Sequence, residues 1–118
     1  MAKILVVDDN MINRKLLSVL VKKLNHTVIE AENGMEALNI IKNEKIDMLL
    51  LDIIMPVMDG IDLLKILKSD SEFSNIPVAI LTTDDTKKKE ALNLGACAVL
   101  IKPFKESDIQ AIIEENLK

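Results

Sequence analysis

The stretch that decides the fold is Met48-Leu49-Leu50-Leu51, which is followed directly by Asp52. It is apolar at every position, not at alternate positions, and this pattern is typical of a strand buried on both faces of a parallel sheet. Four further apolar runs begin at intervals of about 20 to 30 residues, and they lie at residues 4–7, 28–29, 78–81 and 98–101. This spacing predicts a repeated unit of one strand and one helix.

The segments between these runs carry apolar residues at helical spacing, so each is expected to form a helix. Asn10 is a suitable N-cap for the first helix, and Gly95 is suited to end the fourth. The expected helices and their apolar positions are 11–24 (Ile12, Leu16, Val19, Leu20, Leu24), 34–43 (Ala37, Leu38, Ile41), 60–68 (Ile61, Leu64, Leu67), 87–94, and 105–116 (Ile109, Ile112, Ile113). The sequence therefore predicts one doubly wound α/β domain over residues 1–118, with the more polar segment 27–31 as an edge strand.

Composition and charge narrow the class of protein. The chain has 118 residues, of which 49% are hydrophobic and 29% charged, as in an ordinary globular domain. No apolar run approaches the ~20 residues of a membrane span, and residues 1–3 leave no room for a signal peptide, so we expect a cytoplasmic chain without a membrane partner. The single Cys97 and single His26 exclude an internal disulfide and a Cys/His metal site. A net charge of −4 predicts no direct nucleic-acid partner.

Polar residues follow the predicted strands at their carboxyl ends, where open α/β sheets bind ligands. Asp8 and Asp9 follow the first strand, Asp52 the third, Thr82 the fourth and Lys102 the fifth. If the first and third strands are neighbours, the three carboxylates converge and repel one another unless a cation joins them. An all-oxygen ligand set favours Mg²⁺, for which Mn²⁺ can substitute. With the Lys102 ammonium and the Thr82 hydroxyl, this set predicts a cradle for a phosphoryl group.

The group that would accept a phosphoryl can be narrowed by elimination. The chain has no Walker A sequence, no cysteine near this edge and no second histidine. A serine, a threonine or a carboxylate remains. Asp52 is the best candidate because it ends the most apolar strand, where an acid without a partner would be costly.

Four segments of the chain carry a family resemblance. They are Val-Val-Asp-Asp-Asn at residues 6–10, Leu-Asp-Ile-Ile-Met-Pro-Val-Met-Asp-Gly at 51–60, Ile-Leu-Thr at 80–82, and Ile-Lys-Pro-Phe at 101–104. In order and spacing they resemble the signature of the bacterial response-regulator receiver domain, a module of two-component signalling that includes the chemotaxis regulators. The resemblance implies a flavodoxin-like, three-layer (βα)5 fold with strand order 2-1-3-4-5 and a cis peptide bond between Lys102 and Pro103.

The resemblance also implies roles for individual residues. Asp52 would accept a phosphoryl group from a histidine kinase or a histidine phosphotransfer protein, with Lys102 pairing with that group and Thr82 moving toward it. Asp8, Asp9 and Asp52 would hold Mg²⁺ together with the backbone carbonyl of Ile54. The chain would then be a signalling module, not an enzyme with a separate substrate, although it would catalyse its own phosphotransfer and slow dephosphorylation. Its output surface would be formed by the fourth helix, fifth strand and fifth helix.

Two positions depart from the family pattern. The residue after the switch threonine is usually alanine or glycine, whereas here it is the larger, polar Thr83. Many receivers have tyrosine or phenylalanine on the fifth strand where this chain has Val99. Val99 has no ring that could turn inward after phosphorylation. We therefore expect the conformational change to depend on Thr82 and on the loop that follows it, residues 83–86.

Two other functions remain as alternatives at this stage. A Mg²⁺-dependent phosphohydrolase of the haloacid-dehalogenase type would also use an aspartyl phosphate, but it needs a second acid two residues after the nucleophile, where this chain has Ile54. A nucleotide or flavin binder would need a glycine-rich loop, and the glycines at positions 34, 60 and 95 do not form one. The receiver is the favoured interpretation, either as a stand-alone regulator or as part of a longer protein.

Overall fold

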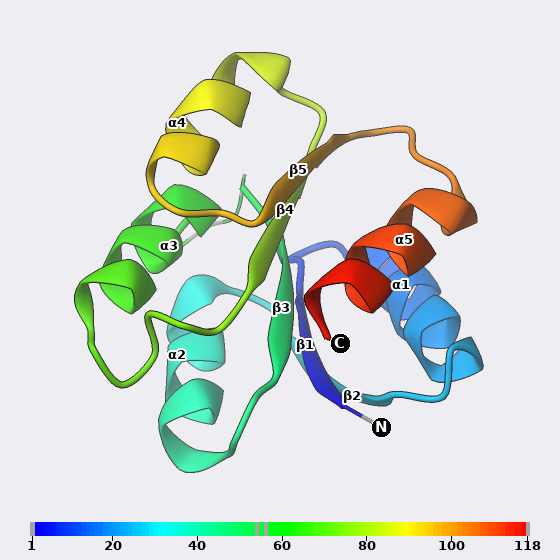
Figure 1. Ribbon diagram of the computed structural model, residues 1–118, viewed down its shortest axis with the longest axis horizontal. Coiled ribbons are helices and arrows are strands. Elements are labelled where there is room, and N and C mark those ends of the chain that lie inside the picture. Colours follow the sequence, from blue (N-terminus) through cyan, green and yellow to red (C-terminus); the bar gives the residue numbers. More distant parts are fainter. Residues whose placement is uncertain (1, 54, 56, 118) are drawn as a thin grey trace.

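A five-stranded parallel sheet forms the centre of the molecule (Figure 1). The computed structural model describes residues 2–53, 55 and 57–117. The strands are β1 (Lys3–Val7), β2 (Thr27–Ala31), β3 (Met48–Asp52), β4 (Val78–Thr82) and β5 (Ala98–Ile101). Their spatial order is β2-β1-β3-β4-β5, which confirms the expected flavodoxin-like order and places the most polar strand, β2, at an edge.

Helices cover both faces of the sheet and complete a three-layer α/β architecture. They are α1 (Met11–Lys23), α2 (Gly34–Asn43), α3 (Gly60–Ser69), α4 (Lys88–Asn93) and α5 (Glu106–Asn116). Figure 1 shows α2, α3 and α4 on one side of the sheet and α1 and α5 on the other. Among the residues that the structure describes, no helix is long and apolar enough to span a membrane.

Alternate residues of each central strand enter two separate hydrophobic cores. In β1, Leu5 and Val7 pack with α2 and α3, whereas Ile4 and Val6 pack with α1 and α5. All four side chains are at most 1% exposed. Burial on both faces is the reason that these strands are apolar at every position.

The first helix forms where expected, but it buries a different face. Asn10 caps it by accepting a hydrogen bond from the Asn13 N–H. Leu17 and Val21 face the core, whereas Ile12, Leu16 and Val19 are each more than 60% exposed. Apolar residues occupy two sides of this helix, and only packing against the sheet selects the side that is buried.

The fourth helix is shorter than its sequence pattern predicts. The expected helix begins at Lys87, but residues Asp85–Lys87 form a 3₁₀ turn and α4 begins at Lys88. Asp84 caps the turn by accepting the Thr86 N–H. The local hydrogen bond begins the helical turn earlier and in the tighter 3₁₀ form, which is common at helix termini.

Candidate functional site

Asp8 occupies the turn between β1 and α1, immediately after the strand ends. Asp8 is only 1% exposed to solvent. One carboxylate oxygen, Oδ1, accepts the Asn10 N–H at 2.9 Å, and the Asp8 N–H donates to the carbonyl of Ala31 on β2. The side chain is therefore fixed by the turn before any ligand binds.

Three carboxylates meet at this edge of the sheet, as the sequence predicts. β1 lies beside β3 with Val7 opposite Leu51. The next residues, Asp8 and Asp52, therefore lie side by side at the carboxyl ends of two adjacent strands. One carboxylate oxygen from each of Asp8, Asp9 and Asp52 lies within 4.8 Å of the other two. Asp8 is buried, Asp52 is partly buried and Asp9 is exposed.

This donor set has the chemistry of a divalent cation site. Carboxylate oxygens are the hard ligands that Mg²⁺ prefers, and an exposed Asp9 leaves one side open to water, which Mg²⁺ usually retains. Three negative groups this close repel one another, and a cation removes that repulsion. The backbone carbonyl of Ile54, the further ligand implied by the resemblance, lies outside the described residues.

Lys102 provides a positive charge beside two of these acids. Its ammonium Nζ lies 3.7 Å from Asp8 Oδ2 and 3.9 Å from Asp52 Oδ2. Its backbone N–H donates to the Thr82 carbonyl at 2.7 Å, which fixes the start of the loop after β5. The peptide bond between Lys102 and Pro103 is cis, which confirms that expectation.

Thr82 ends β4 and is completely buried. Its hydroxyl oxygen accepts the Asp84 N–H at 3.0 Å, so in this structure the hydroxyl is joined to the loop that leads to α4. Hydrogen bonds from the Thr86 side chain and backbone lower the pKa of the Asp84 carboxyl. The loop after Thr82 thus carries a short chain of local hydrogen bonds.

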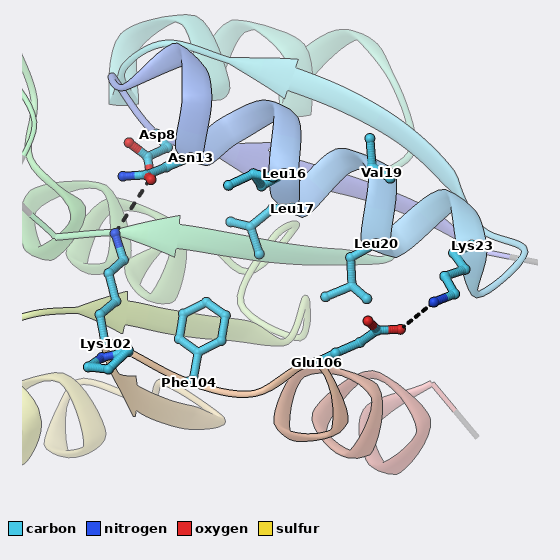
Figure 2. A pocket seen from close by; sticks show the side chains of 11 residues that line it. Asp8, Asn13, Leu16, Leu17, Val19, Leu20, Lys23, Lys102, Phe104 and Glu106 are labelled. Carbon is cyan, nitrogen blue, oxygen red and sulfur yellow. Dashed lines mark ion pairs between the residues drawn. The ribbon is translucent and has the colours of Figure 1, made fainter.

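A groove of about 590 Å³ opens beside the acidic cluster, between α1 and the segment that leads from β5 to the start of α5. Figure 2 shows Asp8 and Lys102 at one end of it and the ion pair of Lys23 with Glu106, at 3.0 Å, at the other. Exposed Leu16 contributes to its apolar wall. The groove leaves an apolar surface directly beside the charged site.

Arg14 is a residue of this region that the sequence analysis missed. It is buried on α1, and its guanidinium donates to the Asp8 carbonyl at 2.9 Å. The signal in the sequence is helical spacing, because positions 14, 17, 18 and 21 lie on one side of the helix, and the structure shows that all four are buried. The arginine in that series was overlooked because charged side chains are seldom buried.

Comparison with known proteins agrees with this geometry. Residues 4–114 match the sequence pattern of the response regulator receiver domain. The chain belongs to this family. It is therefore a receiver domain of two-component signalling, a kind of module that interacts with histidine kinases or histidine phosphotransfer proteins.

Individual relatives of this receiver domain resemble it over nearly their whole length. Protein PilH of Pseudomonas aeruginosa is 39% identical, and the match covers 99% of this chain and 98% of PilH. The chemotaxis response regulator CheY4 of Vibrio cholerae is 32% identical, with a TM-score of 0.90 and 98% of each chain covered.

A second solved structure resembles this receiver domain in fold. The receiver domain of sensor histidine kinase PA1611 from Pseudomonas aeruginosa has a TM-score of 0.90 at 24% identity, with 98% of this chain and 97% of that one covered. That protein has a magnesium ion coordinated in its active site cleft.

Proposed function

We propose that residues 1–118 act as one receiver unit in which Asp52 accepts a phosphoryl group from a phosphohistidine donor in a Mg²⁺-dependent reaction. The observation that carries this proposal is the position of Lys102 between two members of the acidic cluster, Asp8 and Asp52. A cation site beside a fixed ammonium is suited to the charge of a transferring phosphoryl group. Family membership supports the same function.

The reaction needs only groups that lie at this edge of the sheet and the donor itself. A carboxylate oxygen of Asp52 forms the new O–P bond while the P–N bond of the donor breaks. The electron pair of that P–N bond returns to the imidazole of the donor. Lys102 neutralises charge on the phosphoryl oxygens, and Asp8 and Asp9 supply ligands for the cation. When bound, Mg²⁺ would neutralise part of the remaining negative charge. Later attack by water releases inorganic phosphate.

Incubation with acetyl phosphate tests the proposal directly. In the presence of Mg²⁺, intact-mass measurement should show that the chain gains one phosphoryl group and then loses it slowly. Omission of Mg²⁺ should prevent the gain. Rapid turnover of acetyl phosphate without a detectable phosphorylated chain would contradict the proposal and favour a phosphohydrolase.

Replacing Asp9 with alanine should weaken metal binding, because Asp9 is one of three acids placed to share the cation. At a Mg²⁺ concentration of about ten times Kd, the native chain should gain about 1.4 kcal/mol of stability. Asp9→Ala should lose most of this gain. Without metal its melting temperature should not fall, since the change removes a like charge from the cluster.

Thermal melting with and without Mg²⁺ measures this effect. Asp85→Ala is a matched control, because Asp85 is an exposed acid of the β4–α4 loop outside the cluster. The control should keep the native response to Mg²⁺. A native response in Asp9→Ala as well would show that the cation is held elsewhere.

The output change is proposed to begin at Thr82. A phosphoryl group on Asp52 adds about 1.5 to 2 negative charges, which attract the Thr82 hydroxyl as a hydrogen-bond donor. The hydroxyl now accepts the Asp84 N–H, and the Thr82 carbonyl accepts the Lys102 N–H, so its movement would disturb both α4 and β5. We therefore propose the surface of α4, β5 and α5 as the place where an output partner binds.

Thr82→Ala should confine the response to the phosphoryl site. In the native chain, the phosphoryl mimic beryllofluoride should shift backbone amide resonances of α4, β5 and α5. We expect a partial population shift, because complete conversion from 1:99 to 99:1 would require about 5.5 kcal/mol of differential binding. In Thr82→Ala these distant shifts should largely disappear, while those around Asp8 and Lys102 remain.

Backbone NMR with and without beryllofluoride provides the measurement. Thr83→Ala is the matched control, because it removes the same hydroxyl group from the exposed neighbouring residue. Distant shifts that persist undiminished in Thr82→Ala, or that disappear equally in Thr83→Ala, would disprove this route to the output surface.

A further inference from the structure

Arg14 combines two features that rarely occur together, a permanent charge and nearly complete burial. The residue is 7% exposed and lies on the side of α1 that faces the sheet. A buried guanidinium is costly unless its donors are satisfied by hydrogen bonds or charges. In this chain they are directed at the turn that carries Asp8 and at the edge strand β2.

The contacts of the guanidinium connect these two elements. Nη1 donates to the backbone carbonyl of Asp8 at 2.9 Å, and Nε donates to Glu30 Oε1 at 3.0 Å. Nη2 lies 3.8 Å from Glu32 Oε1. Because the guanidinium is planar and its donors point in fixed directions, holding one partner also fixes the direction toward the other.

Glu30 is a firm anchor for this arrangement. It lies on β2 opposite Val6 of β1, so its backbone is part of the sheet. Lys15 contacts its second oxygen, Oε2, at 3.1 Å. Burial raises the pKa of Glu30, but hydrogen bonds from Lys15, Arg14 and Ser18 and the positive charge of Lys15 lower it. The net pKa is below the usual value, which favours the charged form.

The carbonyl that Arg14 holds belongs to the peptide group between Asp8 and Asp9. The Asp8 N–H is fixed by Ala31, and Asp8 Oδ1 is fixed by the Asn10 N–H. The bond from Arg14 to the carbonyl fixes the remaining peptide plane. That plane fixes the position of the Asp9 Cα atom, from which the Asp9 side chain extends, because this atom belongs to the same planar peptide group.

We propose that Arg14 is a positioning residue, which holds the peptide group between Asp8 and Asp9 so that both carboxylates face Asp52 and share one cation. Arg14 acts through the backbone and does not itself touch the cation or the phosphoryl group. This inference rests on the proposed function, since it concerns the same metal site. Residues that orient metal ligands commonly change affinity 10- to 100-fold when they are replaced.

The test compares Arg14→Met with Lys15→Met. Both variants remove a positive group that contacts Glu30, but only Arg14 also contacts the Asp8 carbonyl. The first measurement is the affinity for Mn²⁺ alone, from the electron paramagnetic resonance signal of the free ion. The second is the ¹³C resonance of the Asp8 carbonyl in metal-free protein, which reports the hydrogen bond itself and needs no phosphorylation.

We expect Arg14→Met to bind Mn²⁺ about tenfold or more weakly and to move the Asp8 carbonyl resonance upfield. Lys15→Met should keep native values of both. Glu30→Gln is a third variant, which weakens the anchor but keeps its shape, and it should change both quantities in the same direction by a smaller amount. It decides the question if Arg14→Met does not fold.

The possible outcomes separate this inference from the proposed function. If the native chain binds no Mn²⁺, both are wrong. If the native chain binds Mn²⁺ and folded Arg14→Met binds it equally well, only the role of Arg14 is wrong. The role is also wrong if Lys15→Met weakens binding as much as Arg14→Met, or if Arg14→Met does not fold and Glu30→Gln keeps both native values.

Discussion

Asp52→Asn is expected to abolish phosphorylation of the chain by acetyl phosphate. The asparagine amide has nearly the shape of the carboxylate but is not a nucleophile, so no acyl phosphate can form at this position. The other two acids of the cluster, Asp8 and Asp9, remain, but Asp8 is buried with Oδ1 bonded to the Asn10 N–H and Oδ2 beside Lys102. We therefore expect a loss to background and not a transfer to a neighbouring residue.

Intact-mass measurement after incubation with acetyl phosphate and Mg²⁺ provides the readout. Asp85→Asn is a suitable control, because it makes the same chemical change at an exposed acid outside the cluster, and it should be phosphorylated normally. A melting curve should show that Asp52→Asn remains folded, since the change removes one of three like charges that lie close together. Acid-labile phosphate mapped to another residue of Asp52→Asn would disprove the assignment.

Gly60→Ala is expected to destabilise the chain and to impair phosphorylation as well. Gly60 is the first residue of α3, and its N–H donates to the Ile53 carbonyl at 2.7 Å. A Cβ atom at this position would lie 2.8 Å from Ile53 Cα and still closer to the carbonyl oxygen of Asp52. Both neighbours are backbone atoms, so no side chain can rotate away to make room.

Two effects of opposite sign compete in Gly60→Ala, and their magnitudes decide the result. Helix propensity alone favours alanine over glycine by at most about 1 kcal/mol. Overpacking usually costs about 1 to 3 kcal/mol, and the upper end applies where backbone must move. We expect a net loss of about 2 kcal/mol, which for a domain of this size lowers Tm by roughly 8 °C.

Thermal melting and the rate of phosphorylation together test this expectation. The rate should fall because the displaced backbone belongs to Asp52 itself. Lys65→Ala is the control, since it introduces alanine at an exposed position of the same helix and should leave both quantities nearly unchanged. An increase in Tm for Gly60→Ala would mean that helix propensity outweighs the steric conflict.

Most secondary structure could be predicted because the local pattern and the global fold agree. Strands β3 and β4 are apolar at every position except the last, and burial on both faces of the sheet is the only common setting that requires this. Asn10, the expected N-cap of the first helix, accepts the Asn13 N–H as predicted. The least accurate segment was α4, where a hydrogen bond of Asp84 introduces a 3₁₀ turn that apolar spacing cannot indicate.

The residues of the candidate site could be predicted from the sequence, but the contact of buried Arg14 with the Asp8 carbonyl could not. Asp8, Asp9, Asp52, Thr82 and Lys102 were found because each follows a predicted strand at its carboxyl end, and the structure brings four of them into one cluster of three acids and a lysine. Thr82 lies at the end of the next strand, but its hydroxyl is turned to the backbone of Asp84. Arg14 was missed because charged side chains are seldom buried.

The sequence by itself determined which elements form, their order along the chain and which polar residues stand at the carboxyl ends of the strands, because hydrophobic periodicity and capping are local properties. Tertiary structure decided the rest. It placed β1 beside β3 and so brought three repelling carboxylates within 4.8 Å. It also turned Leu17, Val21 and Arg14 of α1 toward the sheet and left Leu16 exposed, since a helix with apolar residues on two sides takes its orientation from what it packs against.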